Sequence, residues 1–102
     1  MDLTQEAWSS KQSKTEGSII IDVRTPEEFK NGHMANSQLL NIQEPQTFFD
    51  NLKLFDKSRS YFIYCRTGAR SATACQIFKQ QGILNCFNLL GGILDWNGRI
   101  EK

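Results

Sequence analysis

One cysteine of this 102-residue chain lies where its thiol could act as a nucleophile. Cys65 directly follows the apolar run 61–64, and a helical pattern begins at Ser71, with Arg66 and Arg70 in between. A helix N-terminus and neighbouring cations both stabilise a thiolate, so these features predict a lowered thiol pKa. The pattern therefore indicates nucleophilic attack by Cys65; a buried structural thiol is the alternative interpretation.

The loop that joins this strand to this helix is suited to holding an anion. Gly68 has no Cβ, which permits a positive φ and lets the backbone approach a ligand closely. Backbone N–H groups at the start of a helix favour the same negative charge. We therefore expect the substrate to be bound by the six residues that follow the cysteine, namely Arg66, Thr67, Gly68, Ala69, Arg70 and Ser71.

The elements that must position this loop alternate between strand and helix patterns. Four apolar runs predict buried strands, at 19–23, 39–42, 61–64 and 86–90. Helices are predicted over 4–11, 26–30, 45–55 and 71–81, and a terminal helix around Ile93, Leu94 and Trp96, whereas polar residues 11–17 predict a loop. This order, with short connections, predicts an α/β fold: a parallel β-sheet with right-handed crossovers and helices on both faces.

Length and composition indicate a single domain spanning 1–102, with 39% hydrophobic and 23% charged residues. No apolar run approaches the roughly 20 residues needed to cross a bilayer. The N-terminus shows no signal-peptide pattern, so we expect a cytoplasmic protein without a membrane partner.

The three cysteines are spaced for neither a zinc site nor a Cys-x-x-Cys redox pair. They are Cys65, Cys75 and Cys86, separated by ten and eleven positions. We expect Cys75 and Cys86 to be structural. The alternative, that one of them resolves a Cys65 persulfide as a disulfide, stays open.

The net charge of +1 is unevenly distributed along the chain. Residues 1–56 hold nine acids and five bases, whereas residues 57–94 hold five bases and no acid. The loop therefore lies in a segment without carboxylates, which favours a small anionic substrate. Five scattered bases are too few to predict a nucleic-acid-binding face.

The segment from Cys65 to Ser71 resembles the active-site loop of the rhodanese family of sulfurtransferases, which often reads Cys-Arg-x-Gly-x-Arg-Ser. The resemblance extends over roughly 18–98. It includes the Asp-x-Arg strand end and helix at 21–29, the Gly-His turn at 32–34, and the closing Leu-x-Gly-Gly-x-x-x-Trp segment at 88–96. One departure is Ala35-Asn36-Ser37, where the family usually has Pro-Gly-Ala; Asn36 is expected to take the left-handed conformation in place of the glycine.

The resemblance implies a fold and an activity. Cys65 would take the outer sulfur of thiosulfate or of a persulfide and pass it to a thiol or to cyanide, without a metal or organic cofactor. A dedicated persulfide carrier for a protein acceptor is compatible with the same residues. Phosphatases and arsenate reductases of similar fold have a loop one residue longer, Cys-x5-Arg, so the Cys-x4-Arg spacing here favours sulfur over a tetrahedral oxyanion.

Other residues in these motifs are predicted to support the site. Asp22 and Arg24 end a strand, where they could be catalytic; we favour a bracing role, with Glu27 or Glu28 as the partner of Arg24. His33, the only histidine, is expected to fix its turn by hydrogen bonding rather than to act as a base.

Gly91 and Gly92 are expected to shape the turn that closes the domain. They belong to the Leu-x-Gly-Gly segment that resembles the end of a rhodanese domain. We therefore group them with the structural support of the loop and not with the substrate-binding residues.

Overall fold

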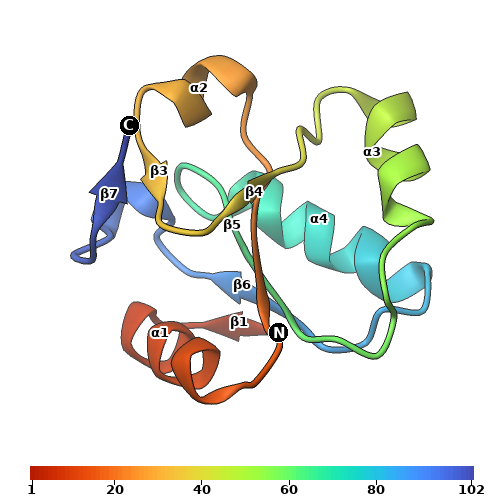
Figure 1. The fold of residues 1–102 in the computed structure, drawn as a ribbon, viewed down its shortest axis with the longest axis horizontal. Helices are drawn as coiled ribbons and strands as arrows, with labels where there is room; N and C mark the ends of the chain where they lie inside the picture. Colours follow the sequence, from red (N-terminus) through yellow and green to blue (C-terminus); the bar gives the residue numbers. More distant parts are fainter.

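A five-stranded parallel sheet forms the centre of the computed structural model, which describes residues 1–102 (Figure 1). The strand order is β1-β6-β5-β2-β4, and every pairing in this sheet is parallel. The strands are β1 (Asp2–Leu3), β2 (Ile19–Asp22), β4 (Gln38–Leu39), β5 (Tyr61–Tyr64) and β6 (Cys86–Leu89). The predicted α/β fold with a parallel sheet is confirmed.

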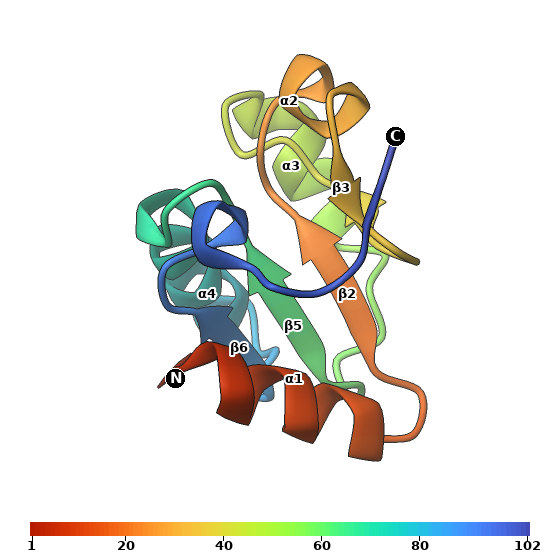
Figure 2. The same cartoon turned by 90° about the vertical axis from the view of Figure 1, so that its left-hand side faces the viewer.

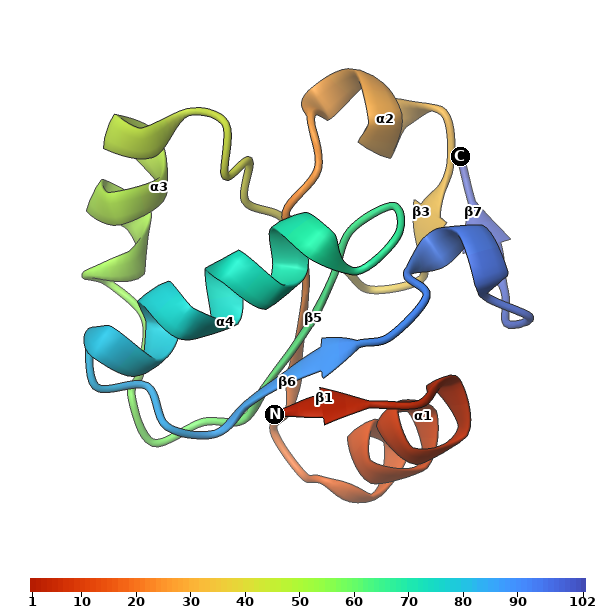
Figure 3. The ribbon, with the colours of Figure 1, turned by 180° about the vertical axis from the view of Figure 1, so that it is seen from behind.

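The chain forms four α-helices, of which three cover the two faces of this sheet and one packs beside it. They are α1 (Gln5–Lys14), α2 (Pro26–Lys30), α3 (Pro45–Leu52) and α4 (Ala69–Gln80). The view from behind in Figure 3 shows α4 crossing over β5, with α3 next to it. Figure 2 shows α1 lying across the sheet on the side away from α4.

The central strand β5 divides the interior into two cores. All four of its residues are buried, and their side chains alternate between the faces, as the pleat of a strand requires. Tyr61 and Ile63 pack with α3 and α4, whereas Phe62 and Tyr64 pack with Trp8 of α1. Because both faces are covered, the whole strand is apolar, which explains why its sequence shows no polar alternation.

Local sequence explains where α2 begins. Thr25 is the N-cap of α2, and its side chain accepts from the N–H of Glu28, while the Glu28 carboxylate accepts from the N–H of Thr25. This reciprocal capping box satisfies two backbone donors at once, and Pro26 supplies a suitable φ at the first helical position.

Several predicted boundaries were wrong. The helix predicted over 4–11 continues to Lys14, through part of the predicted loop, and α4 begins at Ala69 rather than Ser71. The helix predicted over 45–55 ends at Leu52, and the strand predicted over 39–42 is limited to Gln38–Leu39. The two-residue strand β1 was missed, because it is too short to show a sequence period. It pairs with β6 in a register that places Asp2 beside Asn88.

The terminal helix predicted around Ile93, Leu94 and Trp96 was also wrong. Only a single 3-10 turn, η1 (Ile93–Asp95), forms, and the chain is extended again at Trp96. The ring centroids of Trp96 and Trp8 are 5.6 Å apart, so a single turn is enough to bring the apolar side chain of Trp96 against the core. The chain then ends in β7 (Ile100–Glu101), antiparallel to β3 (His33–Met34). No helix is both long and apolar enough to cross a membrane.

Candidate active site

Cys65 is the first residue after β5, and the loop from Arg66 to Gly68 carries the chain into α4. Gly68 is the N-cap of α4 with φ of +106°, a left-handed conformation that favours glycine. A Cβ at Gly68 would lie 3.3 Å from the carbonyl oxygen of Leu89. The predicted strand, loop and helix around the cysteine are therefore all present.

The η1 turn holds this loop from one side, as Figure 3 shows. The N–H of Ile93 donates to the Cys65 carbonyl at 2.9 Å, and the N–H of Leu94 donates to the Arg66 carbonyl at 3.0 Å. A Cβ at Gly92 would lie only 2.3 Å from that Arg66 oxygen. The two backbones can approach this closely only because residue 92 is glycine.

The Cys65 sulfur accepts hydrogen bonds from the loop and from the start of α4. Its Sγ lies 3.1 Å from the N–H of Gly68, 3.4 Å from the N–H of Ser71 and 3.3 Å from the Ser71 hydroxyl. The residue is only 1% exposed. The donors therefore converge on a buried sulfur, which is the arrangement that stabilises negative charge there.

Two opposing effects act on the pKa of the Cys65 thiol. Burial by itself raises this pKa, because it disfavours the thiolate. The hydrogen bonds from the side chain and backbone of Ser71, and from the backbone of Gly68 and Thr67, outweigh burial. The pKa of Cys65 is therefore lowered below its ordinary value, in the direction that a nucleophile requires.

The Ser71 hydroxyl has one proton and two neighbours that can accept it. Its Oγ lies beside Cys65 Sγ and also within hydrogen-bond distance of Asn88 Oδ1. The Asn88 amide is oriented from its other end, where Nδ2 donates to Asp2 Oδ1 at 3.0 Å and to the Gly68 carbonyl at 3.3 Å. Ser71 can thus donate to Asn88 when Cys65 is a thiol, and turn its proton to Sγ when Cys65 is a thiolate.

Arg70 does not stand alone beside the loop. Its guanidinium makes a bidentate ion pair with Glu28 of α2, with contacts of 2.7 and 2.9 Å. No acidic residue lies near the loop in the sequence, and we expected none beside it. In the folded protein, however, α2 places the Glu28 carboxylate against Arg70. Arg66, Thr67 and Ala69 are exposed at the surface.

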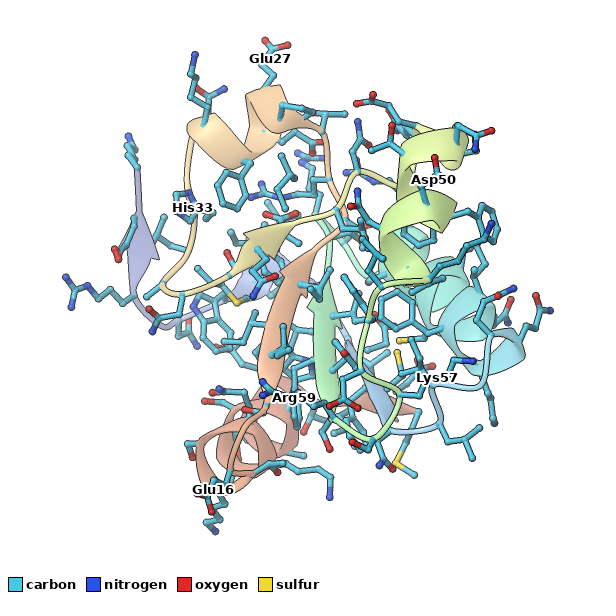
Figure 4. The ribbon with its side chains drawn as sticks, turned by 45° about the vertical axis from the view of Figure 1, so that its right-hand side comes forward. Glu16, Glu27, His33, Asp50, Lys57 and Arg59 are labelled. Atoms are coloured by element: carbon cyan, nitrogen blue, oxygen red, sulfur yellow. The ribbon has the colours of Figure 1, made fainter.

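Asp22 and Arg24 bind each other, and the predicted pairing of Arg24 with Glu27 or Glu28 was wrong. Arg24 Nη2 donates to Asp22 Oδ2 at 2.7 Å and to the Gly32 carbonyl at 2.7 Å, and both side chains are buried. Figure 4 shows Glu27 pointing away from the rest of the molecule. The pair ties the end of β2 to the turn after α2, which is a bracing arrangement.

His33 also contacts its own turn. Its ring stacks on Phe29 with centroids 3.8 Å apart, and Nδ1 lies 2.9 Å from the Phe29 carbonyl. Figure 4 shows His33 beside α2, at the start of β3. Asn36 has φ of +65° and is the only non-glycine residue with positive φ, so the left-handed turn predicted there is confirmed.

The structure separates the other two cysteines from Cys65. Cys75 lies on α4 and Cys86 begins β6, where it pairs with Tyr61 at the far end of β5. No group of three or more His, Cys, Asp or Glu side chains is placed to hold a metal ion.

Sequence reasoning missed Asn88 and the partner role of Glu28. Asn88 is a polar residue inside an apolar strand, which was the available signal for a buried hydrogen-bonding role. Nothing in the sequence linked Glu28 to Arg70, because the two are 42 positions apart.

The chain is similar in sequence and in fold to several known proteins. The rhodanese-like domain family matches residues 5–99. A protein of Allochromatium vinosum named a sulfurtransferase is 34% identical over 96 residues, covering 93% of this chain and 86% of that protein. The putative sulfur carrier protein YrkF of Bacillus subtilis is 29% identical over 100 residues, covering 98% of this chain but 52% of that protein. The crystal structure of a rhodanese-like domain protein from Staphylococcus aureus matches with a TM-score of 0.83 and 32% identity, covering 98% of this chain and 95% of that one.

Proposed function

The chain belongs to the family of rhodanese-like domains, and on that premise we propose that it transfers a sulfane sulfur by way of a persulfide on Cys65. The observation that carries the proposal is the convergence of three donors, from Gly68 and Ser71, on the Cys65 sulfur. Such donors stabilise negative charge on Cys65 before the reaction and on its persulfide afterwards.

The reaction with thiosulfate would proceed in two covalent steps. The Cys65 thiolate attacks the outer sulfur of thiosulfate, the S–S bond of the donor breaks, and sulfite leaves with the bonding electron pair. An acceptor then attacks the outer sulfur of the persulfide, and the Cys65 thiolate leaves. A thiolate acceptor becomes a persulfide, and cyanide becomes thiocyanate.

The arginines are proposed to act on the departing anion. Arg66 is exposed at the mouth of the loop and is free to meet sulfite or another small anion. Arg70 is already paired with Glu28, so the anion must compete with a carboxylate for the guanidinium. We expect Arg70 to orient the loop and to contribute less positive charge than its position in the sequence indicates.

A protein acceptor is the second candidate, in which the domain serves as a persulfide carrier. The similarity to a putative sulfur carrier protein favours it. In addition, Leu90 and Leu94 are 46% and 60% exposed. Both lie next to the loop, since the Leu94 N–H bonds to Arg66 and the Leu90 Cα lies 3.9 Å from where a Gly68 Cβ would be. Exposed leucines beside the reactive sulfur suit a protein partner better than a free anion.

The phosphatase or arsenate reductase alternative gains no support from the site. The donors from Gly68 and Ser71 bond to Sγ itself, 3.1 to 3.4 Å away. A tetrahedral oxyanion needs donors for several oxygens beyond the sulfur.

Intact-protein mass spectrometry after incubation with thiosulfate, and separately with a low-molecular-weight persulfide, tests the proposal. We expect the wild type to gain one sulfur atom, removable by cyanide or a thiol, and Cys65→Ser to gain none. Cys75→Ala is the matched control and should gain sulfur like the wild type. A wild type that never gains sulfur, or a Cys65→Ser variant that does, would refute the mechanism. Uptake from the persulfide with negligible thiosulfate turnover would favour the carrier.

A further inference from the structure

The remaining two cysteines form a pair with its own surroundings. Cys75 Sγ and Cys86 Sγ are 3.0 Å apart, with the Cys86 thiol donating to the Cys75 sulfur. Cys86 is beside Tyr61 in the sheet, whereas Cys65 comes four residues later along the same strand direction. Four residues of extended chain span about 13 Å, so the pair is separate from the proposed sulfur site.

Both cysteines line surface cavities, although each is largely covered. Cys75 is 8% and Cys86 is 5% exposed. They share a cavity of about 320 Å³ with Lys79 and Leu84. A second cavity of about 270 Å³ is lined by Cys75 but not by Cys86. A small solute therefore has two approaches to Cys75 and one to Cys86.

The hydrogen bond between the two thiols gives them different chemical roles. Donation to Cys75, together with burial, raises the pKa of the Cys86 thiol. Because the thiolate is the attacking species, Cys86 is a poor first nucleophile. It is nevertheless placed to react with any electrophilic sulfur that forms at Cys75.

We propose that Cys75 and Cys86 form an oxidisable dithiol that closes to an intramolecular disulfide on reaction with a hydroperoxide. The Cys75 sulfur attacks one oxygen of hydrogen peroxide, the O–O bond breaks, and a sulfenic acid and water result. The Cys86 sulfur then attacks the sulfenic sulfur, the S–O bond breaks, and hydroxide leaves as water with the Cys86 proton. Two thiols lose two electrons, and one peroxide is reduced to two waters.

Closure needs only a small movement. The sulfurs must approach from 3.0 Å to about 2.0 Å, a shift of about 1 Å that side-chain rotation and slight backbone adjustment can supply. The bond would join α4 to β6, the two elements that carry the hydrogen-bonded side chains Ser71 and Asn88. By restricting the unfolded chain across eleven positions, it would also stabilise the fold.

Peroxide treatment of the wild type and of Cys65→Ser tests this proposal without reference to sulfur transfer. After one equivalent of hydrogen peroxide, Cys65→Ser should lose two hydrogen atoms in its non-reduced intact mass. Digestion should yield one peptide pair linked between Cys75 and Cys86, and the oxidised protein should melt about 5 °C higher or more, reversibly with dithiothreitol. With excess peroxide the wild type should give the same linked pair, because Cys65, the more activated thiol, consumes part of the oxidant.

Two variants assign the order of the steps. In the Cys65→Ser background, Cys86→Ala should leave a sulfenic acid at Cys75 that dimedone traps, whereas Cys75→Ser, whose hydroxyl can still accept from the Cys86 thiol, should give little trapping at Cys86. Oxygen addition without loss of two hydrogens, disulfides only between molecules, or a link from Cys65 to either cysteine in the wild type would overturn the proposal. The wild-type peptide map decides the matter even if a variant fails to fold.

Discussion

The Arg70 guanidinium binds the Glu28 carboxylate through two contacts of 2.7 and 2.9 Å, so the end of the cysteine loop is tied to the start of α2. Glu28 has a second role there, because one of its oxygens also accepts from the N–H and hydroxyl of Thr25. One carboxylate thus caps a helix and neutralises an arginine of the proposed substrate loop. This relationship changes what is expected of Arg70 in the proposed sulfur transfer.

We predict that Glu28→Gln lowers stability and strengthens binding of an anionic donor. The variant loses the ion pair, which is worth up to about 1 kcal/mol at a partly exposed position, but releases Arg70 toward the anion. Urea unfolding and the KM for thiosulfate measure the two effects. Glu27→Gln is the matched control, because Glu27 is exposed and next in sequence. An unchanged or raised KM in Glu28→Gln would show that Arg70 serves the loop only through Glu28.

Acid should remove the stabilisation that this ion pair provides. The hydrogen bond from Arg70 is the main cause that lowers the pKa of Glu28 to about 2 in the folded protein, against about 4.3 for an unfolded chain. A group with a lowered folded pKa stabilises the fold above its unfolded pKa and loses that effect as the pH falls to the folded value. The difference in unfolding free energy between wild type and Glu28→Gln should therefore be constant above about pH 5 and shrink toward pH 2. A pH-independent difference would contradict this.

The Cys65 thiol should titrate below the value of an ordinary cysteine. Hydrogen bonds from Ser71 and Gly68 outweigh burial, so the apparent pKa from the pH dependence of alkylation should lie below about 8.5. Ser71→Ala should raise it, since the hydroxyl donor is lost. Peptide mapping identifies the labelled residue. An apparent pKa of about 8.5 or more, or faster labelling of Cys75 or Cys86, would show that the loop does not activate the thiol.

Gly92→Ala should destabilise the protein far more than Gly17→Ala. Both residues have positive φ, and the ψ of −163° at Gly92 places it in a region of backbone conformation that is essentially restricted to glycine. Only at Gly92 would the new Cβ meet another backbone, 2.3 Å from the Arg66 carbonyl oxygen; at Gly17 nothing lies within 4 Å. Thermal unfolding of both variants gives the comparison. Equal losses would mean that the contact between the η1 turn and the loop can relax without cost.

Local sequence determined the fold class of this protein and indicated Cys65 as its proposed nucleophile. Continuous apolar runs such as 61–64 are buried on both faces, and their alternation with helical patterns indicates a parallel sheet. Capping chemistry at Thr25 and the need for glycine at position 68 are also local, because they depend on residues only a few positions apart. For the same reason the left-handed conformation of Asn36 could be predicted.

Only the tertiary structure decided which distant groups meet. The pairing of Arg70 with Glu28, the approach of Asn88 to Ser71 and the contact between Cys75 and Cys86 join residues from different elements. Likewise β1, β3 and β7 are two-residue strands that exist only because partner backbones lie beside them. Such short segments carry no hydrophobic period, and the separation of two side chains in space depends on how whole elements pack. That packing minimises exposed apolar surface across the entire chain, which no local pattern encodes.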